Sequence, residues 1–406
     1  MNYLFNAGPA ETITASKANG KNIYIKDEKL LDLSYAAGSL LLGHTSKVYK
    51  KSLSDLGKIG SNYSYSNIFT ENYSLILKKI FSEYSKFIMC ASGTEANMKA
   101  LRISRAITKK KKIVMVSGSW HGSVDELLYI SKDKKCNKKK NLSNGLSNSK
   151  NTILIPYNNF LESKKILQKN KKQIALVIIE PIQQSIPLHE SENYVKKLHY
   201  FCKKNKIMIC FDEMVTGMRL PEFSVYKKLK IVPDIITFGK IFGGGAPIGV
   251  LGITSEVEKK LIKRDNQVFF GGTYSLNPLS SFLGSNTINY ILKNKKKIYS
   301  KMEKLSHNLS NQLNEFISIK NLDIKIVRYS SIIRIIYSKK NLRNRFDRDV
   351  EEEKKINQIK KFRNYIYKKK IFMSKYGAIF LSYENSIADI NYIAKIFKSG
   401  FEKFFK

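Results

Sequence analysis

Short runs of apolar side chains, separated by amphipathic segments, dominate the middle of the chain. Residues 174–179 and 207–211 are uninterrupted apolar runs, and 235–238 is a third run broken only by Thr237. Between the first two runs, residues 194–205 repeat apolar positions at helical spacing. Strands are apolar throughout when helices cover both faces of their sheet. The pattern therefore predicts an α/β fold with a parallel sheet between layers of helices.

The same alternation continues upstream, and a second pattern begins downstream. Strands are predicted at 87–90 and 113–116, with a helix over 96–107 between them and another beginning near 70. Long helices with few strands follow, which predicts a smaller α+β lobe. Its predicted elements are strands 22–25, 30–33, 331–337 and 378–381 and helices 279–294, 297–316, 350–369 and 387–406. We expect an N-terminal segment 1–50 contributing to this lobe, a large domain 51–285 and a C-terminal small domain 286–406.

Residues 132–151 interrupt the pattern, because they are Lys, Asn and Ser with little else. This composition predicts a flexible surface loop. Loops of this length in compact domains are often active-site lids or disordered, and both alternatives stay open.

The formal charge of +39 changes this picture little. The 72 Lys and Arg residues are spread along the whole chain, so we predict a compositional bias and no nucleic-acid partner. No apolar run is long enough to span a membrane, and residues 1–10 lack the charged and apolar regions of a secretory signal. The four cysteines are scattered without metal-site spacing, which predicts no metal and a cytoplasmic location. They are Cys90, Cys136, Cys202 and Cys210.

Three charged residues directly follow predicted strands. Glu180 follows the strand at 174–179, Asp212 the strand at 207–211, and Lys240 the strand at 235–238 after one glycine. Ligands of parallel sheets bind at the carboxyl ends of the strands. A buried lysine has a lowered pKa and becomes a nucleophile that forms Schiff bases. A surface lysine before a glycine-rich turn is the alternative, and the shared position of the three residues argues against it.

Two further strand ends carry candidate binding groups. Ser92, Gly93 and Thr94 lie on a strand-to-helix turn, where free N–H groups form an anion site, although an ordinary helix cap is the competing interpretation. Trp120, the single tryptophan, follows the strand at 113–116. Its ring could stack on a flat ligand or pack in the core. His44 is predicted to be structural.

These groups together meet the requirements of pyridoxal 5′-phosphate (PLP) chemistry: an imine-forming lysine, a carboxylate for the ring nitrogen, a phosphate turn and a stacking aromatic side chain. The sequence resembles the class III aminotransferases of PLP fold type I, and within them the glutamate-1-semialdehyde 2,1-aminomutases. That fold has a large domain with a mostly parallel central sheet flanked by helices, and a smaller α+β lobe built from both terminal segments. The segments that carry the resemblance are 92–96, 120–122, 156–158, 179–181, 211–219, 238–245 and 272–278.

The resemblance implies roles for residues around the cofactor ring. Lys240 would form the Schiff base, and Asp212 would pair with the pyridine nitrogen. Trp120 would stack on the ring, with His121 in the same cofactor-binding motif, and Met214 would pack on the opposite face.

The resemblance also implies a phosphate site shared between subunits. Gly93 and Thr94 would contact the phosphate, with Ser92 nearby. Thr273 would reach the phosphate of the neighbouring subunit, because family members are homodimers with shared active sites. The implied partner is a small amino or oxo compound, with no membrane association.

The substrate side of the resemblance is incomplete. Val215 stands where many ω-aminotransferases have glutamine, which favours the aminomutases, as do segments 156–158 and 216–219. However, the segment beginning at Gly38 lacks the aminomutase tryptophan, and the acidic residue shortly before 380–382 is missing. We therefore expect aminomutase-like transfer within one molecule. The alternatives are an aminotransferase for another compound, such as a sugar or cell-surface precursor, and a non-catalytic basic binding protein that keeps the fold.

Overall fold

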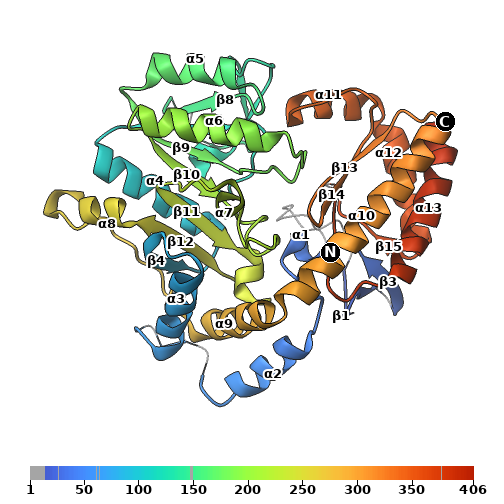
Figure 1. Ribbon diagram of the computed structural model, residues 1–406, viewed down its shortest axis with the longest axis horizontal. Coiled ribbons are helices and arrows are strands. Elements are labelled where there is room, and N and C mark those ends of the chain that lie inside the picture. Colours follow the sequence, from blue (N-terminus) through green and yellow to red (C-terminus); the bar gives the residue numbers. More distant parts are fainter. Residues whose placement is uncertain (1–13, 26, 61, 64, 147–149, 376) are drawn as a thin grey trace.

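The computed structural model describes residues 14–25, 27–60, 62–63, 65–146, 150–375 and 377–406. Its large lobe is built on a seven-stranded sheet of order β4-β12-β11-β10-β9-β5-β8 (Figure 1). All neighbouring strands from β11 to β8 pair in parallel, and β12 is antiparallel to both β11 and β4. The strands are β4 Tyr84–Cys90, β5 Lys112–Val116, β8 Thr152–Ile155, β9 Ile174–Ile179, β10 Met208–Asp212, β11 Ile235–Gly239 and β12 Gly249–Thr254. The predicted mostly parallel sheet is confirmed.

Helices cover both faces of this sheet, which explains its wholly apolar strands. Alternate side chains of β9 enter different clusters: Val177 and Ile179 join one, and Leu176 and Ile178 join the other, packed under α4. Alternation follows from the two-residue period of a strand. The helices of this lobe are α2 Lys47–Leu56, α3 Ile68–Ile80, α4 Gly93–Thr108, α5 Phe160–Asn170, α6 Ser191–Lys204, α7 Val225–Leu229, α8 Ser255–Leu261 and α9 Pro278–Lys293, with short 3₁₀ turns at Asp125–Leu127, Lys240–Gly243 and Arg264–Asn266.

The small lobe combines both ends of the chain. The strands predicted at 22–25 and 30–33 are present and pair antiparallel as β2 and β3, and β3 also pairs in parallel with β15 from the C-terminal part, Leu31 opposite Ile371. A three-stranded sheet of order β13-β14-β16 lies beside it (Figure 1). The elements are β1 Lys17–Asn19, β2 Asn22–Ile25, β3 Glu28–Asp32, β13 Lys325–Tyr329, β14 Ile332–Ile336, β15 Ile371–Phe372, β16 Ala378–Phe380, α1 Tyr35–Gly38, α10 Lys295–Ile319, α11 Arg345–Lys354, α12 Ile356–Lys368 and α13 Ile387–Phe405. The domain limits at 50 and 285 stay a prediction.

Several elements differ from the sequence-based expectation, and β8, β13, α2 and α5 were not predicted. The glycine-containing strand β12 was missed, since its glycines weaken the strand signal. The helix predicted over 350–369 is two helices, α11 and α12, separated at Lys355. The predicted flexible loop at 132–151 contains β7 Lys139–Asn141, which pairs with β6 Tyr129–Ser131. Asp133 stabilises this hairpin because its carboxylate accepts backbone N–H bonds from Lys135, Asn137 and Lys138. Residues 147–149 lie outside the described part.

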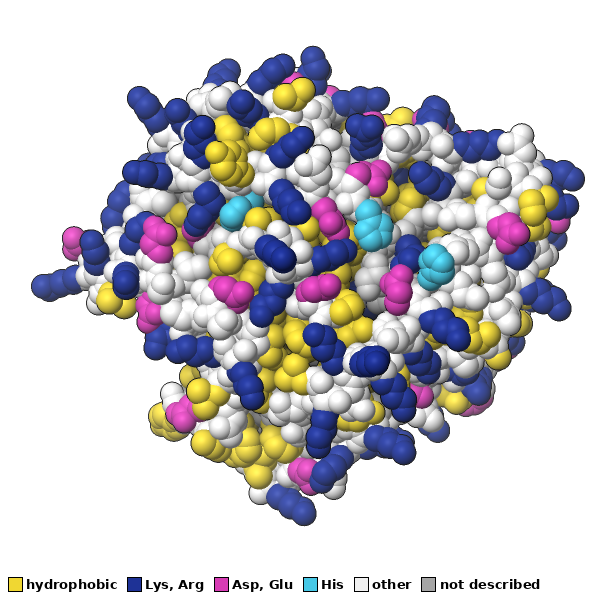
Figure 2. All heavy atoms as spheres, in the orientation of Figure 1, with side chains coloured by type: hydrophobic (Ala, Val, Ile, Leu, Met, Phe, Trp, Pro, Cys, Tyr) yellow, Lys and Arg dark blue, Asp and Glu magenta, His cyan; other side chains and the backbone are white. Residues whose placement is uncertain are grey.

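Basic side chains are scattered over the surface drawn in Figure 2, with acidic side chains between them and no single basic stripe on that face. Within the described ranges, no helix has the length and apolar character needed to cross a membrane. The same ranges hold no group of three or more His, Cys, Asp and Glu side chains that could bind a metal ion.

Candidate active site

The carboxyl edge of the large sheet brings the three predicted strand-end residues together. Asp212 is the last residue of β10, Lys240 follows β11 directly, and Glu180 follows β9. Because β9, β10 and β11 are consecutive parallel neighbours, their carboxyl ends lie at one edge. Glu180 and Asp212 are buried and Lys240 is half-buried, so the three charges act on one another with little screening by solvent.

The Asp212 carboxylate is held by three groups. Its Oδ2 accepts a hydrogen bond from Asn97 Nδ2 at 2.8 Å and contacts His121 Nδ1 at 2.7 Å, and its Oδ1 accepts from the Met214 N–H at 3.1 Å. Asn97 is itself oriented by Thr237, whose Oγ1 donates to Asn97 Oδ1 at 2.8 Å. Side chains locked in this way present a fixed acceptor, which is what a ring nitrogen needs.

His121 leaves one buried polar atom unpaired. Its side chain is fully buried, and its Nε2 has no hydrogen-bond partner among the described residues. Buried polar atoms without partners are uncommon, because their desolvation costs about 1–3 kcal/mol. A bound ligand or water at this position would satisfy Nε2, so the residues present fit a cofactor at this edge of the sheet.

The amine of Lys240 is suited to nucleophilic attack. Desolvation lowers the pKa of Lys240 to about 8, with a further lowering by Arg219, while Glu180 and Asp212 act in the opposite direction. A substantial fraction of the Lys240 amine is therefore neutral near physiological pH, whereas an ordinary lysine is almost fully protonated there. The Nζ atom donates to the carbonyl oxygen of Ala37 at 2.8 Å. Lys240 also has a positive φ of 53°, which is uncommon outside glycine and typical of functional sites.

A left-handed turn in the small lobe supplies the Lys240 acceptor. Tyr35, Ala36 and Ala37 all have positive φ angles of 44°, 51° and 56°. The left-handed conformation costs roughly 1–2 kcal/mol per residue, so neighbouring groups must stabilise it. Asp32 gives this support by accepting the N–H groups of Ser34 at 2.7 Å and Tyr35 at 3.0 Å.

Two side chains complete the support of this turn. The Arg219 guanidinium donates to the carbonyl oxygen of Gly38, at the end of the turn. His44 contacts the Asp32 carboxylate through Nε2 at 2.9 Å, in agreement with its predicted structural role. The turn is thus held by residues of both lobes.

The predicted phosphate turn forms the N-terminus of helix α4, where Ser92 is an ordinary N-cap. Ser92 Oγ accepts from the Glu95 N–H at 3.2 Å, so the capping interpretation holds for this side chain. Helix α4 begins at Gly93, and the first N–H groups of a helix lack intrahelical acceptors. Thr94 Oγ1 accepts from the Ser123 N–H at 3.1 Å. Phosphate contacts by Gly93 and Thr94 stay a prediction.

Met214 and Trp120 occupy different environments. The Met214 Sδ lies so close to Gly93 and Gly239 that a Cβ at either glycine would meet it at 2.8 or 2.7 Å. Met214 thus packs between the phosphate turn and the lysine turn. The Trp120 side chain is 49% exposed, so it is not a core residue and its ring is available for stacking. Thr273 is exposed and stays outside this group of side chains.

Sequence reasoning assigned no specific role to Glu180 and overlooked Asn97. Burial raises the pKa of Glu180 to about 7, and its Oε1 accepts the Trp120 N–H at 2.6 Å. Its position after a parallel strand was the available signal. Asn97 lies on the buried face of α4 with Ala100, Leu101 and Ser104, so a polar residue on an apolar stripe was its signal.

Comparison with known proteins identifies the family. The class III aminotransferase model matches residues 5–352. The chain belongs to the class III aminotransferase family. It is therefore a PLP-dependent enzyme of amino-group transfer, and the alternative of a non-catalytic binding protein is dropped.

Two similar relatives carry the same name. The chain is 33% identical to a glutamate-1-semialdehyde 2,1-aminomutase of Nitrosopumilus maritimus, over 92% of this chain and 89% of the relative. It is 30% identical to an aminomutase of the same name from Caldicellulosiruptor saccharolyticus, over 96% of this chain and 91% of the relative.

Among solved structures, an ω-transaminase from Sphaerobacter thermophilus has a TM-score of 0.88 at 18% identity, covering 96% of this chain and 91% of that one. A glutamate-1-semialdehyde aminomutase from Pseudomonas aeruginosa PAO1 has a TM-score of 0.86 at 17% identity, covering 97% and 88%. These likenesses confirm the PLP fold type I architecture of this class III aminotransferase.

We predict that cofactor loading depends on the neutral form of Lys240. The rate at which PLP reacts with cofactor-free protein, followed by absorbance, should rise with pH and level off above about 8. Glu180→Gln should move this profile to lower pH, because loss of the nearby carboxylate removes an effect that raises the Lys240 pKa. A profile still rising at the ordinary lysine pKa of 10.5 would contradict the assignment.

The control for this experiment is Glu126→Gln. Glu126 pairs with Arg105 at 2.5 Å, and both side chains are partly exposed, so this substitution removes a carboxylate outside the site. Its profile should match that of the unsubstituted protein.

Proposed function

We propose that this class III aminotransferase moves an amino group within one molecule, as a glutamate-1-semialdehyde 2,1-aminomutase. The observation that carries the proposal is the Lys240 amine, whose pKa is lowered and which lies at the same sheet edge as the Asp212 carboxylate. Two relatives of that name align with most of this chain at 33% and 30% identity. The segment from Thr216 to Arg219 is also close to the aminomutase pattern.

The residues of this chain have distinct roles in the proposed reaction. When bound, PLP supplies a carbonyl that captures the amino group and a ring that delocalises electrons. Asp212, fixed by Asn97 and His121, would accept the N–H of the protonated ring nitrogen. Lys240, once its amine is free, would remove the proton from the carbon that bears the amino group, because its lowered pKa suits a general base near neutral pH.

A second candidate is transfer between molecules to another oxo compound. The altered substrate side favours this alternative. Ala37 and Gly38 form the turn beside Lys240 without an aminomutase tryptophan in that segment, and Gly377 precedes β16 without an acidic side chain. Tyr376 lies outside the described residues.

The two candidates are separated by the need for an amino donor. Purified protein should be coloured by its cofactor, and borohydride should fix the cofactor to Lys240, as peptide mass mapping would detect. It should convert glutamate-1-semialdehyde without an external donor, whereas an aminotransferase would need one. Lys240→Ala should keep part of the cofactor binding but lose turnover, by at least about a thousandfold given the role as nucleophile and base. Normal turnover in that variant would contradict the mechanism.

We also infer a homodimer with shared active sites, in the cytoplasm. Large apolar side chains are exposed on two segments, 65–68 and 269–276, with Tyr65 at 77%, Ile68 at 58% and Phe269 at 84%. Asn67 Nδ2 donates to the Leu276 carbonyl at 2.8 Å, so these segments are adjacent. Exposed apolar surface of this extent is typical of an interface. Thr273, proposed to reach the partner's phosphate, lies on the second segment.

Sedimentation should give about twice the chain mass of 46.6 kDa. Phe269→Glu should shift the protein toward monomer and weaken cofactor retention, because a buried charge destabilises the interface. Leu161→Glu is the control, since Leu161 on α5 is 74% exposed and lies away from these segments. A monomeric protein with fully retained cofactor would contradict the inference.

A further inference from the structure

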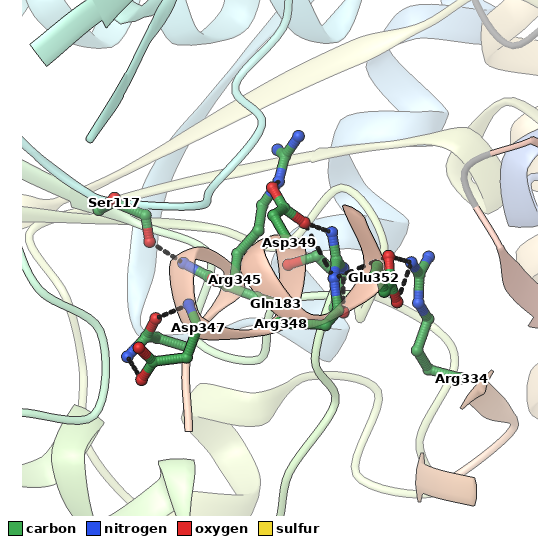
Figure 3. A network of polar contacts seen from close by, with 10 residues as sticks. Ser117, Gln183, Arg334, Arg345, Asp347, Arg348, Asp349 and Glu352 are labelled. Carbon is green, nitrogen blue, oxygen red and sulfur yellow. Dashed lines mark hydrogen bonds and ion pairs between the residues drawn. The ribbon is translucent and has the colours of Figure 1, made fainter. Parts of the chain in front are cut away.

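Arg219 is the most deeply buried arginine of the residues that the structure describes. It is 1% exposed, whereas Arg334 and Arg348 are each 5% exposed. Those two guanidinium groups pair with the Glu352 carboxylate, at 3.2 and 3.4 Å (Figure 3). Arg219 forms no ion pair with any described residue, and its hydrogen bonds go to neutral oxygen atoms. Arginine is almost never fully buried without a charged partner, because an uncompensated buried charge is costly, so this guanidinium calls for a functional explanation.

Neutral groups from separate segments hold the Arg219 guanidinium in place. Its Nε donates to the Val215 carbonyl oxygen at 3.2 Å, and its Nη1 donates to Ser331 Oγ at 3.3 Å. Its Nη2 donates to the carbonyl oxygen of Gly38. The Phe380 ring lies 5.0 Å from the guanidinium carbon, within the range of a cation–π contact. These contacts fix the position of the charge without neutralising it.

The contact with Gly38 places this charge beside the Lys240 amine. Lys240 Nζ donates to the carbonyl oxygen of Ala37 at 2.8 Å, and Arg219 donates to that of Gly38, the next residue. Two cationic side chains thus converge on consecutive carbonyl groups of the left-handed turn. A Cβ at Gly38 would meet Arg219 Nη2 at 3.0 Å and Phe380 Cε1 at 2.7 Å, so the turn packs tightly against the guanidinium.

Neighbouring positive charges disfavour the protonated form of an amine. Burial lowers the pKa of Arg219 to about 10, so its guanidinium stays cationic at neutral pH. The pKa of Lys240 is lowered to about 8, mainly by desolvation, with a raising effect of Glu180 and a lowering effect of Arg219. Because Lys240 loses its proton before Arg219 titrates, the guanidinium acts on the amine and not the reverse.

The other ionisable groups near the turn offer no equivalent charge. Burial raises the pKa of Glu180 to about 7, so its negative charge is incomplete at neutral pH. The Asp32 carboxylate is occupied by two N–H groups of the turn and by His44. Burial also raises the pKa of Tyr299, which faces Arg219 from α10, so this hydroxyl stays neutral. Asp212, which raises the Lys240 pKa, is held by the groups around its own carboxylate.

We propose that Arg219 is a positioning residue for proton transfer by Lys240: it holds the turn that binds the amine, and its fixed positive charge favours the neutral amine. The proposal rests on the proposed amino-transfer function and adds the residue that prepares the base. This role explains the neutral surroundings of Arg219, because a carboxylate partner would cancel the charge that acts on Lys240.

The test measures protonation of Lys240 without the cofactor. Full-length protein freed of cofactor is labelled with trace acetic anhydride from about pH 6 to about pH 11, and the Lys240 peptide is quantified by mass spectrometry. Only the neutral amine reacts, so the midpoint of labelling, expected near pH 8, reports the pKa of Lys240. Arg219→Met removes the charge but keeps a long side chain. It should move the midpoint to higher pH and lower labelling at about pH 7 roughly 3- to 10-fold.

Further variants separate the charge from the packing. Arg219→Lys keeps a cation without the fork of donors, so its midpoint should stay closer to that of the unsubstituted protein. Phe380→Leu loosens the packing of the same guanidinium at constant charge and should leave the midpoint in place. Arg328→Gln removes an arginine that pairs with Glu303 at 2.7 Å, and it serves as the control for loss of positive charge elsewhere.

Hydrogen exchange tests the hold on the turn. The peptide that contains residues 35–38 should exchange its amide hydrogens faster in Arg219→Met than in the unsubstituted protein, and at an unchanged rate in Arg328→Gln. If Arg219→Met does not fold, Arg219→Gln takes its place, since it also lacks the charge and can still donate to the Gly38 carbonyl.

The outcomes distinguish this inference from the proposed function. An unchanged midpoint in the folded Arg219 variant without charge, or an equal shift in Phe380→Leu, would overturn the role of the guanidinium. A midpoint near the ordinary lysine value of 10.5 in the unsubstituted protein would overturn it before any variant is made. No readout uses an amine substrate, so a protein that behaves as expected here but transfers no amino group contradicts the proposed function alone.

Discussion

The clamp around the Asp212 carboxylate is the interaction on which the site depends. An isolated carboxylate with 2% exposure would be costly, and Asn97, His121 and the Met214 N–H offset that cost. Each comes from a different element, so helix α4, the turn after β5 and the turn after β10 are tied to one point. The clamp fixes the Asp212 carboxylate, which we propose as the acceptor for a cofactor ring, and leaves His121 Nε2 as a buried atom that a ligand can satisfy.

The parallel sheet explains how a few residues from distant parts of the sequence form the candidate active site. Strands β9, β10 and β11 end at one edge, so Glu180, Asp212 and Lys240 influence each other's charge without lying close in sequence. The small lobe adds what the sheet cannot supply. Its left-handed turn offers the Ala37 carbonyl to the Lys240 amine. The three strand-end residues thus belong to the large lobe, and the small lobe contributes the turn that contacts Lys240.

Much of this could be predicted from sequence, and the rest could not for physical reasons. The buried strands, Lys240 and Asp212 follow from apolar runs that are directly followed by charged residues. The positive φ angles of Tyr35, Ala36 and Ala37 are stabilised locally by Asp32 and from across the fold by Arg219, and the hydrophobic pattern indicates neither contact. Strand β12 was hidden by its glycines, and the Arg334–Glu352–Arg348 contacts depend on how α11 packs against β14.

The central claim is that Asp212 holds the ring nitrogen of the cofactor in its protonated form while Lys240 carries the cofactor. The most direct measurement is the nitrogen NMR shift of PLP labelled with ¹⁵N in its ring, bound to the unsubstituted protein and to Asp212→Asn. The account predicts a protonated ring nitrogen in the unsubstituted protein and a neutral one in the variant, because an amide cannot stabilise that charge as a carboxylate does. The same neutral shift in both proteins would contradict the account.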